Sequence, residues 1–203
     1  METIQKDSVT FDESQSMKVI REMIQVSQKR LKNDGILFIL WGWYMFYTRM
    51  MSFVLQKIVY THQIKTAIDY FGIAFTVFTL GFSIYYLIKQ HSKVKTYIGI
   101  SLRYVWISLL VCFSITNMII NNVNHSVNFE LQHPVFMVFI ALAIVITGGI
   151  IRYKPVVFGG IIFGLLALGC SYLKLNEQFL LEAIAWLVAF VIPGHILFSK
   201  RKS

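Results

Sequence analysis

Six long apolar runs follow one another along the chain, after a polar segment that covers the first 34 residues. Each run approaches or exceeds the roughly 20 apolar residues with which a helix crosses the core of a bilayer. The runs lack the polar stripe by which a helix of a soluble protein faces water. The pattern therefore predicts six transmembrane helices, at residues 36–55, 67–88, 97–120, 134–151, 156–173 and 179–198.

The polar segment at residues 1–34 has a pattern of its own. Over residues 14–33 apolar residues recur at helical spacing, with basic residues around them. This is typical of an amphipathic juxtamembrane helix, held at the headgroups by apolar burial and by attraction to anionic membrane lipids. The same surface suits docking of a cytoplasmic protein partner, and both alternatives stay open. The basic residues available for either contact are Lys18, Arg21, Lys29, Arg30 and Lys32.

Composition and charge agree with an all-α, polytopic membrane bundle. Hydrophobic residues make up 56% of the chain and charged residues only 14%, a balance typical of proteins in lipid. The net charge of +9 comes from Lys and Arg at the ends of the apolar runs, so it indicates membrane anchoring and not a nucleic-acid partner. With the N terminus in the cytoplasm, fifteen Lys and Arg lie inside and four outside. This asymmetry predicts that both termini are cytoplasmic, with a cytoplasmic segment at 1–34 and a six-helix transmembrane domain at 35–203.

Two of the runs resemble each other. Residues 72–83 and 160–171 match at six of twelve positions, including two glycines and a serine. The two runs would cross the membrane in opposite directions, so a true relation would be an inverted 3+3 repeat, the architecture of many small transporters. Apolar helices draw on few residue types, however, and the same offset aligns the other runs only with gaps. The repeat is therefore a hypothesis.

Charged and polar residues inside the runs are functional candidates, because a charge is costly to place in a membrane. Arg49 near the end of the first run, Asp69 at the start of the second and Glu182 near the start of the sixth share the outer level, and Asn117 reaches a similar depth. We predict that they converge at an outer polar rim that forms a ligand or proton pathway, with Glu182 as the strongest candidate. A structural ion pair, or side chains that reach for the interface, is the alternative.

Other candidate chemistry is weaker. Trp43, Phe46 and Tyr47 share a helix face that could line a pocket for an aromatic or cationic ligand, or could simply pack. His125 and His133, in the predicted outer loop at 121–133, match no established zinc spacing, so we expect neither a metal nor a cofactor. The sequence contains no Gly-rich phosphate loop and no nucleophile elbow. We therefore expect a protein that is not an enzyme.

Two stretches of the chain carry a family resemblance. One is GILFILWGW at residues 35–43, after the juxtamembrane helix, and the other is IPGHIL at 192–197, before a basic tail. They resemble a group of uncharacterised small membrane proteins of Bacteroidota-type bacteria. The resemblance implies the inner membrane of a Gram-negative cell and brings no activity, cofactor or ligand with it.

The sequence leaves two functions from different classes. The first is a non-catalytic membrane protein that binds a partner or senses a signal through its N-terminal helix and outer polar rim. The second is a small secondary transporter or channel, with a homodimer as one form that it could take, in which Glu182, Asp69 and Arg49 lie near the pathway.

Overall fold

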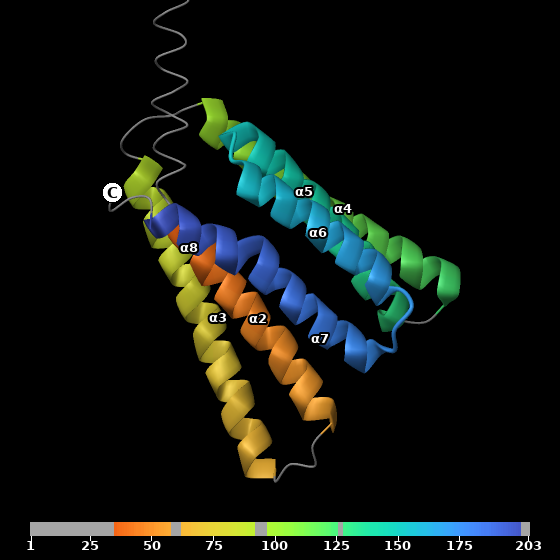
Figure 1. Cartoon of the computed structure of the whole chain (residues 1–203). Coiled ribbons are helices and arrows are strands. Elements are labelled where there is room, and N and C mark those ends of the chain that lie inside the picture. The colour runs from red at the N-terminus through yellow and green to blue at the C-terminus, as the bar shows by residue number, and fades with distance from the viewer. Residues whose placement is uncertain (1–34, 58–61, 92–96, 126–127, 200–203) are drawn as a thin grey trace, which may run out of the picture.

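The computed structural model describes residues 35–57, 62–91, 97–125 and 128–199. Over these ranges the chain is helical almost throughout and contains no strand. The helical elements of these ranges form six rods, the last of which consists of three consecutive segments, and Figure 1 shows their arrangement. In chain order the elements are α2 (Ile36–Lys57), α3 (His62–His91), α4 (Tyr97–Asn124), α5 (Phe129–Ile151), α6 (Lys154–Cys170), α7 (Leu175–Trp186), the π-helical turn η1 (Leu187–Val191) and α8 (Ile192–Ser199).

Each predicted apolar run coincides with one of these rods, which confirms the all-α prediction. Four stretches are long and apolar enough to cross a membrane. The other two rods are less clear, because α6 has only 17 residues and α2 contains Arg49 together with several Trp and Tyr residues. The chain is thus a helical membrane protein, and crossing by all six rods stays a prediction. The four stretches are His62–Tyr86, Gly99–Asn124, Phe129–Ile151 and Leu175–Ser199.

The helices α4 and α5 extend into the region that the sequence suggested was an outer loop. Helix α5 begins at Phe129, where the side chain of Asn128 accepts a hydrogen bond from the backbone N–H of Leu131 at 3.1 Å. Such a cap satisfies one of the free N–H groups at a helix start, and the acidic Glu130 in the first turn suits the helix dipole. His133 therefore lies on a helix and not in a loop.

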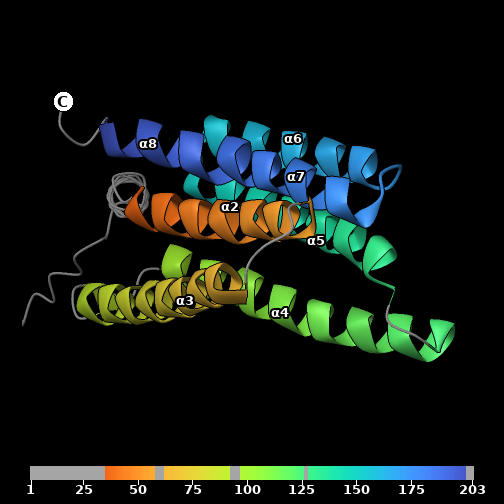
Figure 2. The ribbon, with the colours of Figure 1, turned by 90° about the horizontal axis from the view of Figure 1, so that it is seen from below.

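The core of the bundle is formed by α2, α5, α6 and the long α7–α8 rod. The larger apolar side chains without any exposed surface on α5 and α6 are Met137, Ile144, Val156 and Phe163, and small ones such as Ala185 on α7 are equally buried. Close approach of α5 and α6 requires a glycine at position 160, since a Cβ there would lie 3.0 Å from the backbone nitrogen of Val145. Figure 2 shows α2 and α5 between two outer layers, with α6 and α8 on one side and α3 and α4 on the other.

Helices α3 and α4 are peripheral. In the most apolar stretches of α3 and α4 only 11% and 6% of the residues are buried, against 50% and 56% in α5 and the α7–α8 rod. Helix α3 packs on α2, and α4 packs on α5. Large apolar side chains such as Tyr70, Phe78 and Met118 therefore lie on the surface of the bundle, as expected for helices that face lipid.

The two runs of the suggested repeat occupy different environments. In α3, a Cβ added at Gly72 would have no atom within 4 Å, whereas the matching Gly160 of α6 lies against α5. Helix α3 is peripheral and α6 is central. The structure thus gives the inverted repeat no support, and the repeat stays a hypothesis. The amphipathic helix expected in residues 1–34 lies outside the described residues.

Candidate functional site

The carboxylate of Glu182 is buried between three helices. Its side chain is only 3% exposed. The Nε atom of Arg49 on α2 lies 2.9 Å from Oε1, and Nδ1 of His133 on α5 lies 3.2 Å from Oε2. One turn further along the same helix, the indole N–H of Trp186 donates to Oε1 at 3.4 Å. These four residues, Glu182, Arg49, His133 and Trp186, are called the Glu182 cluster below.

Arg49 forms the accessible side of the cluster. Its side chain is 31% exposed, ten times the exposed fraction of its partner Glu182. The guanidinium carbon lies 6.0 Å from the ring centre of Phe179, a cation–π distance. Arg49 Nε forms no aligned hydrogen bond with any described residue, so its contact with the carboxylate is electrostatic. The cluster therefore combines the buried carboxylate of Glu182 with the partly solvated guanidinium of Arg49.

His133 is held in place from two sides. Its side chain is 14% exposed. Its ring stands edge-on to Phe179, with the ring centres 4.9 Å apart. Because an ionised carboxylate only accepts hydrogen bonds, the short contact with Glu182 favours the imidazole form that carries a proton on Nδ1. The other ring nitrogen, Nε2, has no partner among the described residues.

A proline and a glutamine join α5 to the start of α7, close to the cluster. Pro134 lacks a backbone N–H, so the carbonyl of Glu130, four residues earlier, loses its helical donor. The side chain of Gln178, which is 1% exposed, supplies the missing donor at 3.0 Å and also donates to the carbonyl of Leu173 at 2.9 Å. The Glu182 cluster is thus built on a fixed junction of helices.

The four residues predicted to converge at the outer rim do so only in part. Arg49 and Glu182 pair, as the sequence suggested. Asp69 is exposed on α3 and joins neither of the two ion pairs among the described residues. Asn117 instead accepts a hydrogen bond from the side chain of Gln132 at 3.0 Å and thereby links α4 to α5.

The sequence reasoning missed His133 as a member of the cluster and did not predict that the Trp186 indole donates to Glu182. Two signals were available. Trp186 follows Glu182 by four residues, a spacing that places two side chains on the same helix face. Asn128 and Glu130 are typical of a helix start, and reading them as such would have placed His133 on a helix.

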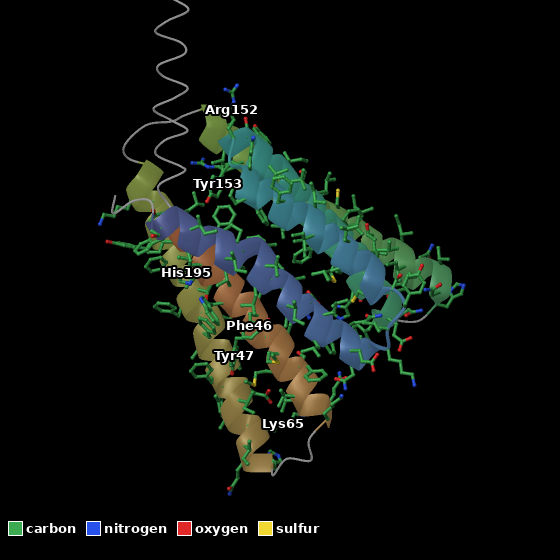
Figure 3. The ribbon with its side chains drawn as sticks, viewed as in Figure 1. Phe46, Tyr47, Lys65, Arg152, Tyr153 and His195 are labelled. Carbon is green, nitrogen blue, oxygen red and sulfur yellow. The ribbon has the colours of Figure 1, made fainter. Side chains whose placement is uncertain are left out.

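The predicted aromatic set Trp43, Phe46 and Tyr47 separates in the structure. Trp43 is 44% exposed and stands edge-on to Phe46, with ring centres 5.6 Å apart. Tyr47 turns toward α3 and packs against Phe71 and Phe75, at 5.2 and 5.7 Å. Figure 3 labels Phe46 and Tyr47 on α2. The set is divided between the surface of the bundle and a helix contact, and it lines neither of the two hollows described below.

Polar side chains, not apolar ones alone, join α2 to α3. The indole N–H of Trp41 donates to the hydroxyl of Ser83 at 3.1 Å. The hydroxyls of Tyr44 and Thr76 lie 3.0 Å apart and share a hydrogen bond. This interhelical contact was not anticipated from the sequence.

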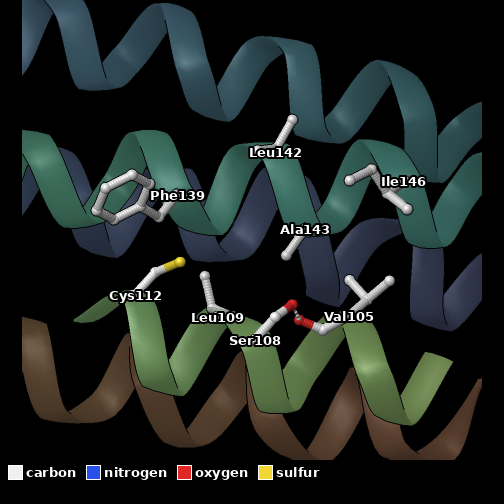
Figure 4. Close-up of a pocket in the computed structure, with 8 residues that line it drawn as sticks. All are labelled: Val105, Ser108, Leu109, Cys112, Phe139, Leu142, Ala143 and Ile146. Atoms are coloured by element: carbon white, nitrogen blue, oxygen red, sulfur yellow. Dashed lines mark hydrogen bonds between the residues drawn. The ribbon is translucent and has the colours of Figure 1, made fainter. Parts of the chain in front are cut away.

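Two hollows lie along α4. Figure 4 shows the first, a cavity of about 110 Å³ between α4 and α5. Its lining is apolar apart from Cys112 and Ser108, and the Ser108 hydroxyl donates to the backbone carbonyl of Val105 at 2.9 Å. The second lies on the surface of α4 around Met118 and Asn121. Neither hollow includes a residue of the Glu182 cluster. Within the described ranges, no three His, Cys, Asp or Glu side chains lie close enough together to hold a metal ion.

The basic docking residues predicted within 18–32 lie outside the described residues. Comparison of the chain with known proteins found no matching family model, no similar curated protein and no similar solved structure. Function therefore has to be inferred from the geometry of the Glu182 cluster.

Proposed function

We propose that this chain is a non-catalytic protein of the cytoplasmic membrane that senses a signal at its outer face, and that the Glu182 cluster is the sensing element. One observation carries the proposal: a single carboxylate, 3% exposed, contacts side chains from α2 and α5 as well as its own helix α7. Because the three helices share one buried charge, a change of charge in the cluster alters the packing of all three.

The energy involved is large enough to move a helix. Removal of one partner from a fully buried ion pair costs about 3–5 kcal/mol, because a charge is left without compensation. The cost is lower for Arg49, which is 31% exposed and keeps part of its hydration. The contact between Arg49 and Glu182 is therefore the contact of the cluster that breaks most easily. This asymmetry suits a sensor, in which α2 responds while Glu182 remains covered.

The α7–α8 rod offers a route from the cluster to the cytoplasmic side. It continues through the π-helical turn η1, where the N–H of Ile192 donates to the carbonyl of Leu187, five residues earlier. Pro193 follows and removes another helical donor. Single π-helical turns inside α-helices are frequent at functional sites. The π-helical turn and Pro193 together give the rod a deformable middle.

The alternative of a transporter or channel has less support from the geometry. Such a pathway was expected to pass Asp69, Arg49 and Glu182, but Asp69 lies on the exposed surface of α3. Neither of the two described hollows reaches the cluster. A homodimer and a cytoplasmic partner remain compatible with the sensing function.

The proposal is tested by neutralising Glu182 and following the separation of α2 from α7. Spin labels at Gln56→Cys and Glu177→Cys, both exposed positions, report that distance in the full chain in lipid vesicles. Exposed Cys112 is first replaced by serine, while Cys170 is buried and stays. We expect Glu182→Gln to change the distance distribution, because a neutral amide no longer balances Arg49.

Asp69→Asn is the matched control, since it also converts a carboxylate to an amide but on an exposed position of α3. We expect it to leave the distance unchanged. Identical distributions for wild type and Glu182→Gln would overturn the sensing function. A proton leak across wild-type vesicles that disappears in Glu182→Gln would favour transport instead.

A further inference from the structure

We infer that the signal is a proton and that His133 binds it at Nε2, with Glu182 as the carboxylate that holds the protonated ring. This inference rests on the proposed function and names the ligand of the same site. It stands on the position of one imidazole between a buried carboxylate and the end of the bundle predicted to be outer.

The position of His133 suits a proton acceptor. It lies four residues after the first residue of α5, about 6 Å along the helix at 1.5 Å per residue. Its 14% exposed side chain can exchange protons with water at that end of the bundle. Nδ1 faces Glu182, so Nε2 is the nitrogen left to accept a proton. Imidazole is the side chain that ordinarily changes charge between about pH 5 and 8.

The charges around the cluster determine what a proton does there. With a neutral His133, Arg49 and Glu182 balance each other. Of the other titratable groups near Glu182, α6 contributes Cys170, which interacts with Glu182 electrostatically. On α5, the carboxylate of Glu130 accepts a hydrogen bond from the start of α7 at 3.4 Å. Protonation therefore sets two cations against the one buried carboxylate.

The direction of the response follows from the exposure of the two cations. A protonated imidazole strengthens the contact between α5 and α7, because a charged donor replaces a neutral one. The protonated imidazole then repels the guanidinium of Arg49 beside the same carboxylate, and this repulsion offsets part of the attraction that Glu182 exerts on Arg49. Arg49 is the more exposed of the two cations, so water can solvate its guanidinium when it leaves Glu182. Acid at the outer face thus tightens α5 on α7 and loosens α2.

The experiment uses the labels at residues 56 and 177 in the full chain in vesicles, while the pH is varied from 5 to 8. We expect the distance between α2 and α7 to increase as the pH falls. His133→Gln should remove this dependence. His62→Gln should retain it, because His62 is an exposed histidine at the start of α3 whose ring, among the residues that the structure describes, lies 3.0 Å from the hydroxyl of Thr66 on its own helix. A wild-type protein without pH dependence, or a His133→Gln variant that keeps it, overturns the inference.

A second measurement needs no variant at His133. In chains labelled with ¹⁵N-histidine, one imidazole resonance must titrate with the same midpoint as the distance between α2 and α7. Absence of any such resonance, with all five histidines followed, overturns the inference even if His133→Gln fails to fold. The outcome is distinct from failure of the proposed function, which is judged by Glu182→Gln at a single pH.

Discussion

Alanine at Gly160 and alanine at Gly72 are expected to have opposite effects, although the two glycines match in the sequence. A Cβ at position 160 would lie 2.7 Å from Cγ2 and 3.0 Å from the backbone nitrogen of Val145, so α6 and α5 would have to move apart. Overpacking of this kind costs about 1–3 kcal/mol. A Cβ at position 72 would meet nothing within 4 Å.

The helix propensity of alanine raises stability at both positions, by about 1 kcal/mol relative to glycine in a helix interior. Since both variants gain this contribution, it cancels when they are compared. We therefore expect Gly160→Ala to be less stable than Gly72→Ala by about 1–3 kcal/mol. Gly72→Ala itself should exceed the wild type in free energy of unfolding, by up to about 1 kcal/mol.

The assay is reversible unfolding of the purified chain in mixed detergent micelles, followed by circular dichroism. Gly148→Ala serves as a second crowded position, because its Cβ would lie 2.7 Å from the backbone nitrogen of Val157. Equal free energies of unfolding for Gly160→Ala and Gly72→Ala would refute the packing of α5 on α6 described above.

Three further substitutions or modifications have defined outcomes. Trp41→Phe removes one hydrogen bond between α2 and α3 and should lower the free energy of unfolding by about 0.6 kcal/mol. Trp43→Phe, at an exposed ring, should change this free energy less. Equal effects of the two substitutions would argue against the hydrogen bond. In folded protein in vesicles, a water-soluble maleimide should spare both cysteines, because Cys112 lies in the middle of the apolar helix α4 and Cys170 is buried in the bundle, and labelling of Cys170 before unfolding would contradict its burial. Gln178→Leu leaves two backbone carbonyls without their side-chain donor and should cost about 1–3 kcal/mol in the same unfolding assay, so unchanged stability would contradict the junction of α5 with α7.

The existence of each helix could be predicted, because the length of an apolar run is enough to specify a helix. The ends of the helices and the faces that they turn inward could not be predicted in this way. The transmembrane helix predicted at residues 134–151 had Pro134 as its first residue. In the structure Asn128 caps the helix earlier, and Gln178 compensates for the missing N–H of the proline. That compensation comes from a residue 44 positions away. No local pattern around residue 134 contains it.

The level of each candidate residue along its helix could be predicted from the sequence. The helix face on which its side chain lies could not. Arg49 and Glu182 share a level, and they pair. Asp69 was placed at the same level, yet it lies on the exposed surface of α3. A helix that is apolar on all sides gives no sign of which face meets a neighbour. His133 joined the cluster because α5 starts early, which only the cap at Asn128 indicated.

The pairing of α2 with α7 also has a consequence for biosynthesis. Arg49 leaves the ribosome 133 residues before Glu182. At about 5–20 residues per second, it waits roughly 7–27 s for its counter-charge. During this interval α3 to α6 are made, while the arginine has to rely on water or headgroups at the membrane surface. A chain whose translation stops before residue 182 keeps that exposed charge permanently. A chain that stops before residue 182 thus differs chemically from a longer one by an arginine without its counter-charge.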